Sequence, residues 1–318
     1  MILFGLTWFL LALGPTAQIM PHHISRADRF LYLPLVGLAI SLGMILRPSA
    51  TAAKRPGAGL AVGLVGALAL LSLGALSARQ VRIWRDSVTL WTHCLTVEPM
   101  NPYGHSALAD NLVIRGQFDE AVGHYQTALR IAPDHADTLG DYAWALAACE
   151  DPRKRDFELA LGLAERACRL TGWKEPRILR KYSVVHTNLG NELVARGRFE
   201  RAADHYREAI AADPSFETPQ FGLALLLTTC PDEQLRRPDE AVRHAERGCR
   251  LIEQPDAHRL TILAAAYAEA GKFDEAVNTI DRAIARAGTE GCSPEMTAEL
   301  RRQRSRYRAG KRFDPLPE

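Results

Sequence analysis

The sequence has little excess charge and few aromatic side chains. Its 318 residues carry 39 Lys and Arg against 37 Asp and Glu, for a formal net charge of +2, and Phe, Trp and Tyr make up 7%. A nucleic-acid-binding domain gathers a basic stripe that outweighs its acids. Here the basic residues are interleaved with Asp and Glu. We therefore expect no nucleic-acid partner.

The motifs of common enzyme and cofactor chemistry are also missing. The sequence contains no glycine-rich phosphate loop, no nucleophile elbow and no zinc-type spacing of Cys and His. His22 and His23 are adjacent, so their side chains diverge, and no third metal ligand stands beside them. We expect no bound metal, no cofactor and no catalytic residue in this chain.

What the chain does contain is a repeat. From Pro102 onward, a pattern of small, apolar and aromatic residues returns with a period of about 34 residues, within the range of helical repeat architectures. Small residues at fixed offsets let two helices approach closely, and aromatic residues fill the volume beside them. The three clearest copies are Leu108, Ala109, Leu112, Gly116, Phe118, Ala121, Tyr125, Ala128 and Pro133; Leu189, Gly190, Leu193, Gly197, Phe199, Ala202, Tyr206, Ala209 and Pro214; and Leu263, Ala264, Tyr267, Gly271, Phe273, Ala276, Ile280 and Ala283.

These residues resemble the tetratricopeptide repeat (TPR), a hairpin of two helices, A and B. The resemblance implies an all-α superhelical solenoid that binds a polypeptide, because each hairpin buries too little alone and must stack on its neighbours. We predict the array over 86–291 and a capping helix with a tail over 292–318. A half repeat over 86–101 precedes repeats that start at residues 102, 136, 183, 217 and 257. The second and fourth repeats carry five extra residues between helices A and B.

Residues 1–85 have a different composition from the rest of the chain. Uncharged stretches cover about 2–19, 30–46 and 57–78. At about 22 residues, the third stretch is long enough to cross a hydrocarbon core of about 30 Å. A cleaved signal peptide is the alternative for the first stretch, but its positively charged start is missing. We predict about three transmembrane helices, and the distribution of Lys and Arg leaves their orientation open.

The loop after the first predicted span carries a second resemblance. Residues 27–34 read Ala-Asp-Arg-Phe-Leu-Tyr-Leu-Pro. With spans around this loop and TPRs behind it, the chain resembles the C-terminal part of the transmembrane, TPR-containing O-mannosyltransferases of the glycosyltransferase C superfamily. This implies extracytoplasmic (periplasmic or lumenal) repeats and a polyprenyl-linked sugar, whose phosphate would contact Arg26, Asp28, Arg29 and Tyr32. On the residues alone, interfacial anchors are the better explanation of these side chains, with Tyr32 in the aromatic belt.

The same family keeps its catalytic acids in the first extracytoplasmic loop, far ahead of the repeats. In this chain Asp28 is the only carboxylate before Asp86. We therefore expect no transferase activity from the chain by itself, whether it is a truncated or a split gene product. Two functions stay open: a membrane-anchored TPR scaffold for protein–protein interaction, and the membrane and acceptor-binding part of a polyprenyl-phosphate-sugar-dependent, O-mannosyltransferase-like glycosyltransferase.

The concave face of a TPR array is lined by helix A, and this face is the expected partner groove. Because Asn188 and Asn191 have no Lys or Arg in the neighbouring groove positions, we expect an extended, mixed or apolar polypeptide rather than an acidic C-terminus. The alternative is a solvated face, or one that packs on the chain's own membrane region. The groove candidates are Tyr103, Asp110, Trp144, Asn188, Asn191 and Phe221.

Four of the six cysteines fall at matching repeat positions. The interval along the sequence between Cys149 and Cys168 is the same as that between Cys230 and Cys249. Outside the cytoplasm each pair could form a disulfide that ties the longer loop to helix B. In an ordinary hairpin, however, the two positions lie roughly 15 Å apart by helix rise, which favours free thiols in helix contacts.

Overall fold

The computed structural model describes residues 81–313 and, before them, only residues 64, 67, 68, 71, 72, 75 and 78. The chain divides into two compact units, Met1–Arg85 and Asp86–Glu318. The first two predicted spans and the four lipid-phosphate candidates lie outside the described residues, and the third span is described only at those few positions. In the part that is described, no helix has both the length and the apolar character to span a bilayer. The three spans therefore stay predictions.

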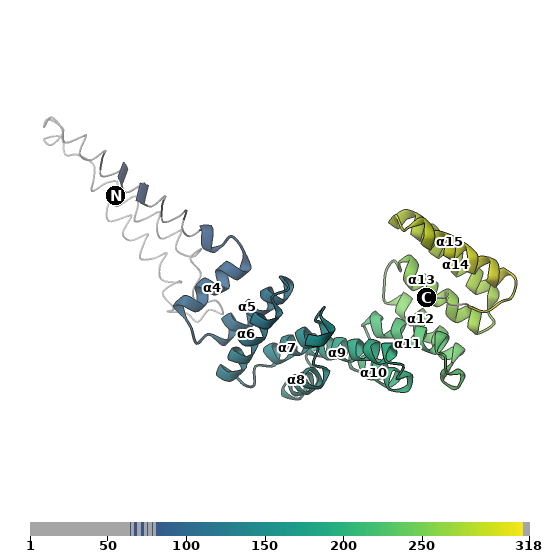
Figure 1. The fold of residues 1–318 in the computed structure, drawn as a ribbon, viewed down its shortest axis with the longest axis horizontal. Coiled ribbons are helices and arrows are strands. Elements are labelled where there is room, and N and C mark those ends of the chain that lie inside the picture. Colours follow the sequence, from purple (N-terminus) through teal and green to yellow (C-terminus); the bar gives the residue numbers. More distant parts are fainter. Residues whose placement is uncertain are drawn as a thin grey trace, which may run out of the picture. The chain divides into compact units, whose positions relative to one another are not determined.

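The described residues of the second unit are helical, which confirms the predicted all-α array. Consecutive helices pair as hairpins, α5 with α6, α7 with α8, α9 with α10, α11 with α12 and α13 with α14 (Figure 1). The α-helices are α4 (Ser87–Val97), α5 (Pro102–Ile114), α6 (Phe118–Ile131), α7 (Ala136–Ala148), α8 (Phe157–Leu170), α9 (Pro176–Ala195), α10 (Phe199–Ala212), α11 (Glu217–Thr229), α12 (Pro238–Arg250), α13 (Ala257–Glu269), α14 (Phe273–Glu290) and α15 (Pro294–Arg308).

Local signals set the ends of these helices. Asn101, Asp156 and Asp256 each accept a hydrogen bond from the backbone N–H three residues ahead, which satisfies a donor at the start of α5, α8 and α13. Gly116 and Gly197 have φ of +74° and +70°, a left-handed conformation that costs glycine little. Each of these glycines therefore lets the chain turn from helix A into helix B within a few residues.

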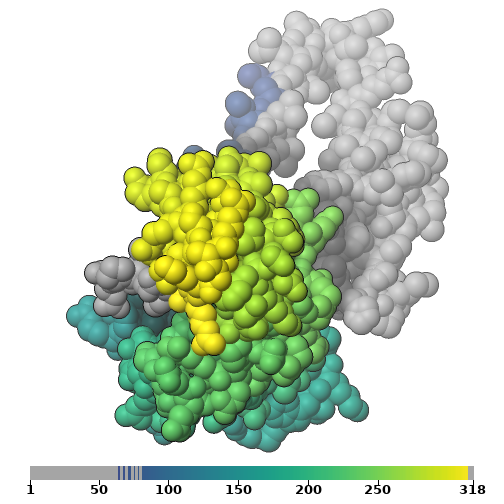
Figure 2. Space-filling view, turned by 90° about the vertical axis from the view of Figure 1, so that its right-hand side faces the viewer, coloured from purple at the N-terminus to yellow at the C-terminus, as the bar shows by residue number. Residues whose placement is uncertain are grey.

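The first member of each hairpin also packs on the first member of the next, so α5, α7, α9, α11 and α13 form a continuous row. Alanines at the predicted small positions are fully buried between helices; Ala109, Ala202 and Ala276 expose none of their surface. At the C-terminal end, α15 packs on α14 and buries Leu300 and Tyr307. These last helices lie foremost in Figure 2, and α15 closes the apolar end of the array.

One aromatic ring joins two neighbouring repeats. The ring of Tyr206, on α10, lies against Gly190 of its own repeat and Gly222 of the next; an added Cβ would come within 2.7 Å and 2.8 Å of ring carbons, respectively. Its hydroxyl donates to Asn191 Oδ1 at 2.7 Å. Glycine is needed at both positions because real Cβ atoms do not approach a ring so closely.

The two insertion loops, residues 149–156 and 230–237, share one architecture. Each contains a short 3-10 helix, η4 (Pro152–Lys154) or η5 (Glu233–Leu235). Arg155 Nε donates to the carbonyl of Cys149 at 2.7 Å, and Arg236 Nε donates to the carbonyl of Cys230 at 2.7 Å. Each arginine thereby satisfies an acceptor at the end of helix A that the helix cannot use itself.

All six cysteines are free thiols in the structure. Cys149 follows the last turn of α7 beside the insertion loop, whereas Cys168 lies near the opposite end of α8. Most of α8 separates Cys168 from the start of that helix, a rise of roughly 16 Å, so the hairpin geometry keeps the two sulfurs apart. Burial raises the pKa of the Cys168 thiol to about 11, which leaves it protonated and unreactive at neutral pH.

Candidate partner-binding face

The predicted groove is the surface formed by the first helix of each hairpin. We call this surface the A-helix face. Residues three or four apart on a helix share one side. This places Asp110 with Ile114 on α5, and Asp141 with Trp144 on α7. The members of the A-helix face are Tyr103, Asp110, Ile114, Asp137, Asp141, Trp144, Lys181, Asn188, Asn191 and Leu225.

Tyr103, Asn188 and Asn191, which were predicted to line the groove, already have partners within the chain. Tyr103 is 63% exposed and makes an edge-on ring contact with Trp91, centroid to centroid 5.8 Å. Asn188 Nδ2 donates to the carbonyl of Ala147 at 3.3 Å, which links α9 to α7. Asn191 accepts from Tyr206, as described above. The amide groups expected to read a partner's backbone are therefore partly used in holding the array together.

Phe221 does not belong to this face, so that prediction is wrong. The side chain is only 5% exposed and lies in the core between α11 and α12. Gly248 leaves the space that the ring occupies, because a Cβ there would come within 2.7 Å of it. The Arg259 guanidinium stacks over the ring, 5.8 Å from its centroid. Phe221 stabilises the array and has no free face for a ligand.

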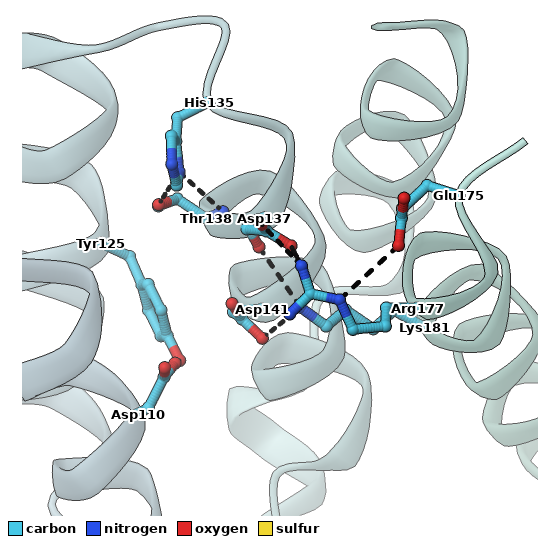
Figure 3. A network of polar contacts seen from close by, with 9 residues as sticks. All are labelled: Asp110, Tyr125, His135, Asp137, Thr138, Asp141, Glu175, Arg177 and Lys181. Atoms are coloured by element: carbon cyan, nitrogen blue, oxygen red, sulfur yellow. Dashed lines mark hydrogen bonds and ion pairs between the residues drawn. The ribbon is translucent and has the colours of Figure 1, made fainter. Parts of the chain in front are cut away.

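Carboxylates from α5, α7 and the residue before α9 lie in the first part of the A-helix face (Figure 3). The hydroxyl of Tyr125, on α6, donates to Asp110 Oδ1 at 2.6 Å. Asp141 Oδ1 pairs with Lys181 Nζ at 2.5 Å. Burial and the neighbouring charge of Asp141 raise the pKa of Asp110 to about 6, against the opposing influence of the Tyr125 hydrogen bond and Lys181. Asp110 is therefore a half-buried acid without a cation of its own.

A second ion pair continues this network toward the start of α9. Arg177 contacts Asp137 Oδ1 at 3.2 Å and Glu175 Oε1 at 3.6 Å. Lys181 and Arg177 lie on the first two turns of α9, which begins at Pro176, ahead of the predicted start of the third repeat. The expectation that no basic residue accompanies the groove is wrong here, because Lys181 lies on the A-helix face and Arg177, one turn before it on α9, pairs with Asp137 of that face. Four carboxylates against two cations still leave an excess of negative charge.

A pocket of about 640 Å³ lies next to these carboxylates, between the ends of α5 and α7 and the first insertion loop. Ile114, 81% exposed, and Trp144, 36% exposed, are its exposed large hydrophobic members. We call it the Ile114–Trp144 pocket. It is lined by Val113, Ile114, Arg115, Gly116, Phe118, Trp144, Ala148, Cys149, Glu150, Asp151 and Lys154. It offers an apolar surface bordered by charged side chains.

The histidines follow a pattern that the sequence reasoning missed. In three repeats, a polar side chain on helix A meets a histidine on helix B at the same two repeat positions. The second repeat has Leu139 and Leu163 there instead. The equal interval within the two histidine–histidine pairs is visible in the sequence, whereas the pair of Gln220 and His244 matches only after the insertion is removed. The pairs are His105 Nδ1 with His124 Nδ1 at 2.9 Å, His186 Nδ1 with His205 Nδ1 at 3.1 Å, and Gln220 Oε1 with His244 Nδ1 at 2.7 Å.

Burial lowers the pKa of several of these paired histidines. It lowers the pKa of His186 to about 4, aided by the neighbouring His205, and it also lowers the pKa of His124 and His205. His186 Nε2 is buried without a hydrogen-bond partner. Among the described residues no cluster of three His, Cys, Asp or Glu side chains could hold a metal ion. The pairs therefore act as neutral contacts between helices.

Comparison with known proteins identifies the repeats. Models of the tetratricopeptide repeat match residues 102–135 and 260–292, and a model described as TPR repeat matches residues 190–228. The array is a TPR domain. Its fold is similar to that of PilW, a type IV pilus biogenesis factor (TM-score 0.50, 18% identity, 71% of this chain and 94% of PilW). It is also similar to PilF of Pseudomonas aeruginosa (TM-score 0.51, 18% identity, 76% of this chain and 96% of PilF).

Two sequence relatives carry the name protein O-mannosyl-transferase TMTC1. The human protein is 31% identical over 115 residues, which are 36% of this chain and 13% of the human protein. The mouse protein is 31% identical over 117 residues, or 36% and 12%. This TPR chain thus spans about an eighth of the length of either relative.

Proposed function

We propose that the protein is a membrane-anchored scaffold whose TPR domain binds a polypeptide on the A-helix face. One observation carries the proposal: Tyr103, Ile114 and Trp144 expose large apolar or aromatic surface on the first helices of neighbouring repeats. Such side chains are typical anchors of protein–protein contacts. Stacked helical repeats commonly use such extended surfaces for binding. The uncharged stretches within residues 1–85 support membrane anchoring.

A photo-reactive amino acid placed at single positions tests this proposal. We expect a discrete adduct with a second polypeptide when the probe replaces Ile114, on the A-helix face. A probe at Arg130, an exposed position on α6 of the same repeat, is the matched control and should give no adduct. Equal adducts from the two positions, or none from either, would contradict binding on the A-helix face.

The second candidate is the membrane and acceptor-binding part of a glycosyltransferase, supported by the partial identity to the O-mannosyl-transferases. In this proposal the TPR domain is extracytoplasmic, and Arg26, Asp28, Arg29 and Tyr32 contact the phosphate of a polyprenyl-linked sugar. The bound acceptor would then be a polypeptide on the A-helix face.

Sidedness decides whether this second candidate can hold. Reporter fusions placed after Phe313 are expected to be active only on the extracytoplasmic side of the membrane. A fusion after Arg47, in the loop between the second and third predicted spans, should report the cytoplasmic side. A cytoplasmic signal from the fusion after Phe313 would reject both the topology and the lipid-phosphate role of the first loop.

A further inference from the structure

The A-helix face is not uniform, and its first two repeats combine two kinds of surface. The Ile114–Trp144 pocket offers apolar area, and Asp110 with Asp141 lies one helical turn before it on the same sides of α5 and α7. We propose that this part of the A-helix face binds an extended polypeptide segment that carries an apolar side chain and a Lys or Arg two residues apart. This inference rests on the proposed function and specifies the partner's chemistry.

Charge complementarity favours a Lys or Arg in the ligand over an acidic side chain. The basic side chains at the Ile114–Trp144 pocket already have acidic partners: Arg115 Nη2 contacts Asp86 at 2.7 Å, and Lys154 Nζ contacts Asp119 at 2.7 Å. Glu150 has no ion pair with any described residue. An acidic partner would meet no available cation here, whereas a cationic one would find an excess of carboxylates.

Asp110 is the carboxylate best placed to receive this cation. Asp141 is neutralised by Lys181, and Asp137 is neutralised by Arg177, whereas Asp110 accepts a hydrogen bond from the Tyr125 hydroxyl and forms no direct ion pair with a described residue. A ligand ammonium or guanidinium group would supply the missing counter-charge at a site where water screens it only partly. Because that hydroxyl occupies one carboxylate oxygen, it also fixes the direction in which the other oxygen can accept.

The distance between Asp110 and the Ile114–Trp144 pocket sets the distance between the two ligand side chains that bind there. Asp110 and Ile114 are four residues apart on α5, about 6 Å along the helix axis. In an extended peptide, side chains two residues apart point to the same side and lie about 6.6 Å apart. An apolar side chain in the Ile114–Trp144 pocket therefore places the residue two positions away beside Asp110. In an α-helical ligand the same spacing of about 6 Å would need residues four apart, so a pair two residues apart is specific to an extended ligand.

The experiment uses the purified full-length chain and fluorescent nonapeptides with a central Leu-x-Lys or Lys-x-Leu. Matched peptides replace Lys by Glu, or Leu by Ser. We expect one order of the Leu and Lys peptide to bind at least tenfold more tightly than its Glu and Ser counterparts. Binding should weaken about tenfold in Trp144→Ala and about fivefold in Asp110→Asn. Asn keeps an acceptor for Tyr125, so the array should stay intact.

Arg130→Ser, at an exposed position on α6 away from the A-helix face, is the control and should leave peptide binding unchanged. Leu225→Ser, at the position of Trp144 in the other repeat with an insertion loop, tests whether the peptide binds to a later part of the A-helix face instead. Ile114→Ser is a second pocket variant that should fold normally, because the exposed Ile114 side chain contributes little to the core. It should weaken binding as much as Trp144→Ala.

Affinity for the Lys peptide should also rise between pH 5 and pH 7 as Asp110, facing Tyr125, Asp141 and Lys181, loses its proton. Asp110→Asn should remove that rise.

Equal affinity for the Lys and Glu peptides, or full binding by Asp110→Asn and Ile114→Ser, would overturn the inference. If binding survives those changes but is lost in Leu225→Ser, a polypeptide still binds the A-helix face and only the assigned chemistry fails. Absence of peptide binding to every variant, together with no adduct from the probe at Ile114, would remove the proposed function as well.

Discussion

The variant Ala202→Leu is expected to unfold at a temperature about 5–10 °C below that of the unmodified chain. Ala202 lies on α10 with none of its surface exposed, inside the core shared by α9, α10 and α11. Three additional carbon atoms have no space there, and overpacking of this kind costs about 1–3 kcal/mol of the free energy of unfolding. A solenoid can also part at a single interface, so partner binding should weaken while membrane insertion stays unchanged.

Arg201→Ala is the control for this prediction. Arg201 is the preceding residue on the same helix, and its side chain is exposed, so its loss should change neither the unfolding temperature nor protease resistance. The measurement is thermal unfolding by circular dichroism, paired with limited proteolysis of the same samples. If the two variants were equally stable, the repeat positions assigned to α10 would be incorrect.

Acidification from pH 7 to pH 5 is expected to destabilise the array through the histidine pairs. A histidine whose folded pKa lies below its unfolded value contributes stability above the unfolded pKa of about 6.5, and that contribution is lost as the pH falls toward the folded pKa. For buried His186, with a folded pKa of about 4, the loss at pH 5 is about 2 kcal/mol. Asp110 acts in the opposite direction, because its raised pKa favours the folded state as the pH falls.

The double variant His186→Leu with His205→Leu isolates this effect. The second repeat already has leucines at the same positions, so the substitution follows a solution that the chain itself contains. We expect the variant to lose much less stability between pH 7 and pH 5 than the unmodified chain. His93→Gln, at an exposed site on α4, should keep the original dependence. An unchanged pH profile in the double variant would mean that the pair is not the acid-sensitive contact.

Positions that depend on one helix and its nearest turn were predictable. The small residues at Ala109 and Ala202, and the left-handed glycines at Gly116 and Gly197, follow from the period alone because every copy needs the same close approach. The repeat register also predicts that Asp110 lies on helix A beside the groove positions, but its raised pKa was not foreseen, and its role in partner binding stays a prediction.

Features that depend on a distant partner were not predictable. Phe221 fits the pattern of a groove residue, and only Gly248, on another helix, shows that its ring turns inward. Lys181 reaches the A-helix face because α9 starts earlier than the repeat pattern requires. The contact between Arg155 and the carbonyl of Cys149 depends on how the insertion loop folds back. Each of these needs the three-dimensional position of a second segment, which periodicity does not contain.

The matching insertion loops show that the array repeats in blocks of two hairpins. Cys149 and Cys230, Arg155 and Arg236, and the two histidine–histidine pairs are all related by one constant interval along the sequence, which spans two hairpins. The first turns of α9, residues 176–182, lie at the joint between the two blocks, and they carry both Arg177 and Lys181. The cations that neutralise Asp137 and Asp141 therefore come from a segment outside the hairpin pattern.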